Sequence, residues 1–114
     1  MRMRDMFAMA CVMVNSSPRK TYWVKNQDGT VSIWIRINTE SGSKEKVAEL
    51  IDDVRKSVME IGERASRGSG RIISCNSFLG SDKDKNLEVV GMAMLECNDS
   101  IENELERMNV VKVS

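Results

Sequence analysis

The sequence has no histidine and one proline, and aromatic residues make up only 4% of its 114 residues. Without histidine, the chain has no Ser-His or Cys-His nucleophile pair and no His-ligated metal site. It also lacks an apolar run of about 18 residues, which a membrane-spanning helix needs. We therefore expect no membrane partner.

Cysteine is scarce, and its three copies, Cys11, Cys75 and Cys97, stand alone. No C-x-x-C pair is present, which excludes a zinc ribbon and a thioredoxin-like motif. An odd number of isolated cysteines is typical of a reducing compartment. We expect free thiols, a cytoplasmic location, no metal site and no cofactor.

Net charge is also absent, because 17 basic residues balance 17 acidic ones, and 41% of the chain is hydrophobic. This composition excludes a disordered chain. The charge is uneven, however, since residues 1–36 carry six basic and two acidic residues. The asymmetry permits self-association but is too small to indicate nucleic-acid binding by itself.

Nine apolar residues, Met6 to Val14, follow Arg2, Arg4 and Asp5. The arrangement resembles a secretory signal, but an acidic residue precedes the stretch and few apolar residues lie before Cys11. We expect residues 1–20 to be a Met-rich packing segment, either helix or strand. Residues 21–114 are then a single domain.

Two strands and a turn are predicted after this segment. Thr21–Lys25 is typical of a short strand, and Asp28-Gly29 is a strong hairpin signal. From Val31 to Asn38, apolar and polar residues alternate, which indicates an antiparallel strand with one buried face.

A helix should follow, with Ser43 as its N-cap and Glu45 in its first turn. Its apolar stripe consists of Val47, Leu50, Ile51, Val54, Val58 and Ile61. Strands are then expected over residues 72–79 and 87–97, a second helix capped by Asp99, and a last strand over residues 110–113.

From Val31 onward this order predicts an α+β fold. It is a two-layer ferredoxin-like (βαββαβ) antiparallel sheet with two helices on one face, plus an N-terminal apolar segment and a β-hairpin. The hairpin strand and the C-terminal strand compete for one side of the Val31–Asn38 strand. Either the hairpin extends past the sheet or the last strand lies elsewhere, for example on a partner subunit.

The alternation also predicts which side chains face away from the helices. A two-residue loop at Asp28-Gly29 places Trp23 opposite Trp34, both on the outward face. In the second hairpin, Ile73 is expected to face the core and Ile72 to face outward. The outward face is then a partner or ligand face made of Trp23, Trp34, Arg36, Phe78, Met92 and Met94.

An apolar sheet face implies that something covers it. A second copy of the chain, the Met6–Val14 segment or a ligand could do so. RNA recognition motifs share the strand order, and Ile33–Asn38 and Val90–Leu95 resemble their first and third strands. Met92 and Met94, however, stand where that family places stacking aromatic rings, which weakens binding of bases.

A basic loop between the first helix and the next strand is the other candidate site. Its members Arg64, Arg67, Gly68, Gly70 and Arg71 could form a small anion site, since glycines let backbone N–H groups approach a phosphate. A solvated linker is the alternative interpretation.

Three functions remain open. The first is a non-enzymatic binding or regulatory module that acts as a homodimer or larger homo-oligomer through the outward face. The second is a single-stranded nucleic-acid (RNA) binding module that uses Trp34, Arg36 and the 64–71 loop. The third, a small enzyme, has no visible catalytic constellation, so we predict no catalytic residues.

Overall fold

The computed structural model describes residues 20–39, 43–67, 71–96 and 98–113. The predicted packing segment therefore lies outside the described residues, apart from Lys20. The elements are β1 (Lys20–Lys25), β2 (Thr30–Asn38), α2 (Lys44–Ala65), β3 (Ile72–Ser81), β4 (Leu87–Glu96), α3 (Asp99–Arg107) and β5 (Val111–Lys112). They form a mixed α+β structure, as predicted.

The five described strands make one sheet in the order β3-β4-β2-β1-β5. This order departs from the predicted ferredoxin-like one. β1 forms six residue pairs with β2, so the hairpin strand, one of the two candidates, occupies this side of β2. β5 pairs in parallel with β1 instead, at the outside of the sheet. The hydrogen-bonding groups on one side of β2 can serve only one neighbour, and the hairpin strand is closer in sequence.

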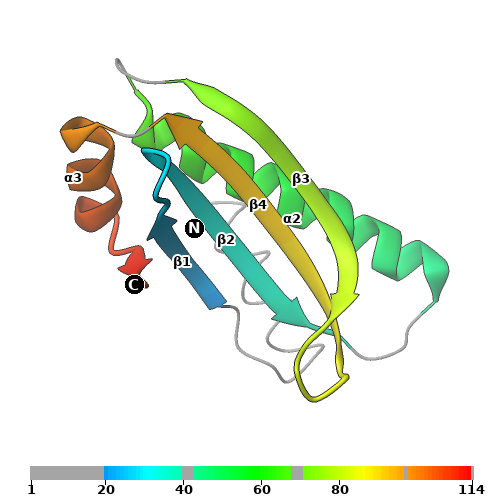
Figure 1. The fold of residues 1–114 in the computed structure, drawn as a ribbon. Helices are drawn as coiled ribbons and strands as arrows, with labels where there is room; N and C mark the ends of the chain where they lie inside the picture. The colour runs from blue at the N-terminus through cyan, green and yellow to red at the C-terminus, as the bar shows by residue number, and fades with distance from the viewer. Residues whose placement is uncertain (1–19, 40–42, 68–70, 97, 114) are drawn as a thin grey trace.

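The two described helices, α2 and α3, pack on the same face of the sheet, and Figure 1 shows α2 crossing behind β3 and β4. The alternating residues of β2 that were predicted to face the core are fully buried there. They contact Val54 and Val58 of α2 and Ile101 and Leu105 of α3 in a single core cluster. Burial of this apolar surface is the main favourable contribution to folding.

The helix ends follow from local chemistry. Ser43 caps α2 as predicted, because its hydroxyl accepts a hydrogen bond from the Lys46 N–H at 3.2 Å. The predicted cap of α3 is wrong by one residue. Asn98 is the N-cap, with its side-chain oxygen 3.0 Å from the Ile101 nitrogen, and Asp99 lies in the first turn. An acidic residue in the first turn still favours the helix through its dipole.

The β1–β2 hairpin has a longer loop than predicted. The Asn26 N–H bonds the Thr30 carbonyl at 2.8 Å, which leaves three residues in the loop, and Gly29 adopts a φ of 87°. Glycine adopts this left-handed conformation readily, as in three-residue hairpin loops. Trp23 therefore pairs with Ile33 rather than Trp34. A shift of one residue moves every side chain of a strand to the other face, so Trp23 faces the helices.

A second correction concerns the start of β3. The β3–β4 register shifts between Ile72 and Ser74, which marks a β-bulge or irregularity. Ile72 consequently packs against the core and Ile73 is 47% exposed, the reverse of the prediction. Bulges insert an extra residue into a strand and invert the facing of residues on one side of them.

Candidate functional site

Tyr22, Trp34 and Met92 lie in one row across β1, β2 and β4, on the sheet face opposite the helices. The Tyr22 and Trp34 rings are stacked, with centroids 6.5 Å apart and planes at 16°. Aromatic pairs at this separation stabilise each other beyond the area they bury. This stack is the centre of what we call the outward face.

The neighbouring rows extend the outward face. Val90 lies between Arg36 and Phe78, and Met94 lies opposite Ser32. Phe78 is 49% exposed, on the edge strand β3. The structure thus brings five of the six residues predicted for this face together: Trp34, Arg36, Phe78, Met92 and Met94.

The prediction is wrong for the sixth residue, Trp23, which does not lie on the outward face. It lies on the helix side of the sheet, is only 4% exposed and belongs to the core cluster. Tyr22 occupies the position on the outward face where Trp23 was expected. The sequence alone does not show which of the two residues faces outward, because this depends on whether the hairpin loop has two residues or three.

Arg36 is tied to other groups on the same face. Its Nε donates to Glu88 Oε1 at 3.1 Å, its Nη2 also contacts that oxygen, and Nη1 lies 3.4 Å from the Tyr22 hydroxyl. Glu88 has only 6% of its side chain exposed. The hydrogen bonds to Glu88 and then Tyr22 raise the pKa of the Arg36 guanidinium above its ordinary value. The charge of Arg36 is therefore balanced within the face itself.

The predicted anion loop is only partly described. Gly68 and Gly70 lie outside the described residues. Arg64 is in the last turn of α2, where a cation favours the helix dipole. Arg71 forms an exposed ion pair with Glu96 at 3.1 Å, and Arg67 is exposed at the end of the helix. The described arginines do not converge on a common site.

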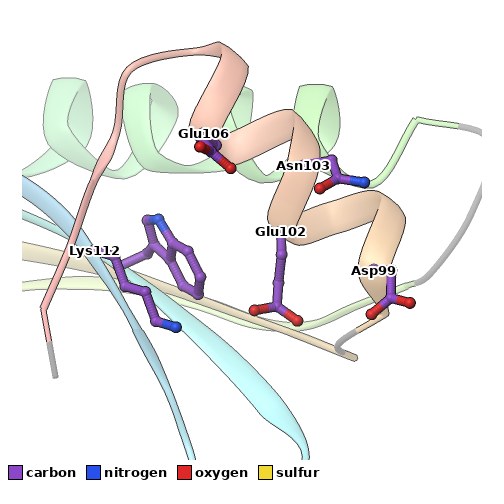
Figure 2. Close-up of a pocket in the computed structure, with 6 residues that line it drawn as sticks. Asp99, Glu102, Asn103, Glu106 and Lys112 are labelled. Atoms are coloured by element: carbon purple, nitrogen blue, oxygen red, sulfur yellow. The ribbon is translucent and has the colours of Figure 1, made fainter.

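A hollow that the sequence did not indicate lies between α3 and the β1–β5 edge of the sheet. It encloses about 420 Å³, and we call it the α3 groove; its lining residues are Trp23, Asp99, Glu102, Asn103, Glu106 and Lys112. Figure 2 shows the labelled side chains of α3 on one side of this groove and Lys112 on the other. A second hollow of about 460 Å³ shares Trp23, Glu106 and Lys112 with it and continues along Val110 and Val111.

The spacing of polar residues in α3 could have marked one wall of this groove, but not the groove itself. Asp99, Glu102, Asn103 and Glu106 recur at the three- and four-residue intervals that define one helix face. Their neighbours across the groove, Trp23 and Lys112, come from strands that are far apart in the sequence. Only the pairing of β5 with β1 brings them together.

Other chemistry is sparse in the part of the chain that the structure describes. Among these residues no group of three His, Cys, Asp or Glu side chains could hold a metal ion. Cys75 is a free, half-buried thiol, and burial raises its pKa. A raised pKa disfavours the reactive thiolate. No described helix is both long and apolar enough to span a membrane.

Comparison with known proteins gives no relative for this chain. It matches no protein-family model, no curated protein sequence and no solved structure.

Proposed function

We propose that this protein is a small non-enzymatic binding or regulatory module that acts as a homo-oligomer through its outward face. The observation that carries the proposal is the row Tyr22–Trp34–Met92, which crosses three strands on the face opposite α2 and α3. An antiparallel sheet normally has polar residues on a face without helices. A connected aromatic and methionine surface is typical of a binding site.

A second copy of the chain is the partner that the charges favour. In a two-fold contact the same patch meets itself, so any unbalanced charge would repel its own copy. Near the centre of the outward face, Arg36 and Glu88 are paired with each other, while Lys20, opposite Arg36 in the β1–β2 register, is exposed at the start of β1. Two such faces can therefore approach without like-charge repulsion at their centres.

Single-stranded nucleic acid is the alternative partner, since the Tyr22–Trp34 stack offers ring surface to a base. Two observations make it the weaker proposal. Arg36, the cation expected to contact phosphate, is held by Glu88 and Tyr22. The described arginines of the 64–71 loop are engaged locally or dispersed. Phosphate contacts by free cations supply most of non-specific affinity.

The test is solution mass by light scattering coupled to size exclusion, over a range of protein concentrations. We expect the wild-type chain to form a dimer or larger oligomer, and Trp34→Glu to shift it toward the monomer. Trp34→Phe keeps an aromatic ring and should retain association. Met92→Glu tests the same face on another strand, should Trp34→Glu fail to fold by circular dichroism.

Ala48→Glu is the matched control, because Ala48 is exposed on α2, on the other side of the sheet. It adds the same charge and should leave the mass unchanged. A wild-type chain that stays monomeric at high concentration, or a folded Trp34→Glu oligomer of unchanged mass, would contradict the proposal. Salt-sensitive binding of the monomer to single-stranded RNA would favour the alternative.

A further inference from the structure

We propose that the α3 groove binds a lysine or arginine side chain on an extended, basic segment of another protein, and that this segment adds to the sheet beside β5. This inference does not rest on the proposed association, since the groove lies on the helix side of the sheet. Four features of the groove and its edge support it.

The groove already holds an ammonium group from the chain itself. Lys112 Nζ lies 5.2 Å from the centroid of the Trp23 ring. A cation at this distance over an indole face is attracted by the negative ring face. Trp23 is 4% exposed, and its Nε1 is a buried donor without a partner among the described residues. The Nε1 donor calls for an acceptor, so the ring face alone suits a cation, and Lys112 shows where one would lie.

The rim of the groove is acidic. Asp99, Glu102 and Glu106 face a single cation of the lining, Lys112. Glu102 is joined to Lys25 at 3.2 Å, whereas Asp99 and Glu106 form no ion pair with the described residues. An incoming basic side chain therefore meets carboxylates that are available to it.

The position of Glu106 in α3 is not explained by the stability of the helix. It lies in the last turn of α3. A negative charge there opposes the helix dipole, while the same charge on Asp99 in the first turn favours it. Glu106 also lines both the α3 groove and the second hollow along β5. Its place is explained if it meets a positive ligand.

Among the described residues, no strand pairs with the outer side of β5, next to the groove. β5 is the last strand in the order, and its described pairing is with β1. The Val113 N–H bonds the Trp23 carbonyl at 2.8 Å, so the peptide groups alternate and the N–H and C=O of Lys112 point away from β1. Val111 is 63% exposed beside them. An extended peptide can pair with such an edge and place alternate side chains in the groove.

The experiment measures fluorescence anisotropy with the full chain and a labelled peptide of alternating lysine and valine. We expect binding that weakens with added salt. The same peptide with glutamate in place of lysine should not bind. Methylation of alternate backbone nitrogens should weaken binding by about tenfold or more, because it removes the strand hydrogen bonds.

Two variants locate the site. Glu106→Gln should weaken binding by roughly two- to fivefold, as for loss of one exposed ion pair. Lys112→Met should tighten it, because the peptide no longer displaces an internal cation from Trp23. Glu49→Gln and Lys46→Met make the same changes at exposed positions of α2 and should have no effect.

Several results would overturn the inference. They are no binding, equal binding of the glutamate peptide, no effect of backbone methylation, or no effect of Glu106→Gln. Peptide binding that weakens as protein concentration rises would assign the edge to a second copy of the chain, and would also overturn it. A folded Trp34→Glu variant should bind the peptide as the wild type does, which separates this inference from the proposed association.

Discussion

Gly91 lies where α2 packs directly against the backbone of β4. A Cβ at this position would lie 2.5 Å from Val54 Cγ1 and 3.3 Å from the Val54 carbonyl oxygen. Val54 is fully buried and β-branched, so its side chain has little freedom to move. The absence of a side chain at residue 91 therefore sets how closely the helix and β4 pack.

We expect Gly91→Ala to lower the free energy of unfolding by about 1–3 kcal/mol, the usual range for overpacking a core. Urea unfolding followed by circular dichroism measures it. Adding Val54→Ala should recover part of the loss, because the clashing methyl group is removed, so the double variant is less destabilised than the two single changes predict.

Gly80→Ala provides the control, since a Cβ there would be 3.5 Å from the nearest atom, an ordinary contact. It should change stability by less than about 0.5 kcal/mol. Equal losses for the two alanine variants would mean that strand propensity, and not the contact with Val54, decides the result.

Among the elements, the two hairpins both depend on an aspartate in their loops. In the β1–β2 loop, Asp28 Oδ1 accepts a hydrogen bond from the Thr30 N–H at 3.0 Å. In the β3–β4 loop, Asp82 Oδ1 accepts from the backbone N–H of Asp84 and of Asn86, each at 2.9 Å. Asp82 Oδ2 accepts from Asn38 Nδ2 at 3.0 Å, which ties this loop to the end of β2.

These hydrogen bonds lower the pKa of Asp82, and the one from the Asn86 backbone N–H has the largest effect. A lowered pKa in the folded state means that Asp82 stabilises the fold above its unfolded pKa of about 3.9. This stabilisation is lost as the pH falls through the lower, folded value. We expect Asp82→Ala to be less stable than wild type at neutral pH, with the difference shrinking in acid.

Thermal unfolding at about pH 7 and about pH 3 measures this change. Asp84→Ala, two residues along and exposed, should give the same small difference from wild type at both pH values. A gap between Asp82→Ala and wild type that is constant with pH would show that the ionised carboxylate is not what the loop needs.

At the scale of the whole molecule, the two ends of the sheet differ in length and charge. β5 has two residues, while β3 has ten, and none of the ten is charged. Its exposed apolar side chains include Ile73, Phe78 and Leu79. Proteins usually place charges or prolines on such an edge, because its free N–H and C=O groups can pair with another chain.

Phe78→Lys should therefore reduce aggregation on heating, measured by turbidity, by placing a charge on the β3 edge. The free energy of unfolding should change little, because Phe78 is 49% exposed. Ala48→Lys adds the same charge on α2 and should leave turbidity unchanged. Unaltered aggregation of Phe78→Lys would show that the heated chains meet neither at the β3 edge nor at the part of the outward face around Phe78.

The sequence by itself determined the elements of this protein. The stripe of α2, its Ser43 cap and the alternation of β2 arise from contacts within a few residues of each other, and all three predictions are confirmed. Alternation also predicted the facing of Trp34, Met92 and Met94. Local spacing carries this information because it fixes which side chains share a face.

The tertiary structure decided what depends on distant partners. The place of β5 depends on β1 having filled the side of β2 first. The facing of Trp23 depends on one residue of loop length, and that of Ile72 on the register shift at the start of β3. The α3 groove joins β1, α3 and β5, so no local pattern contains it. Hydrogen-bonding groups on a strand edge are satisfied by whichever segment reaches them, and only the folded chain shows which one does.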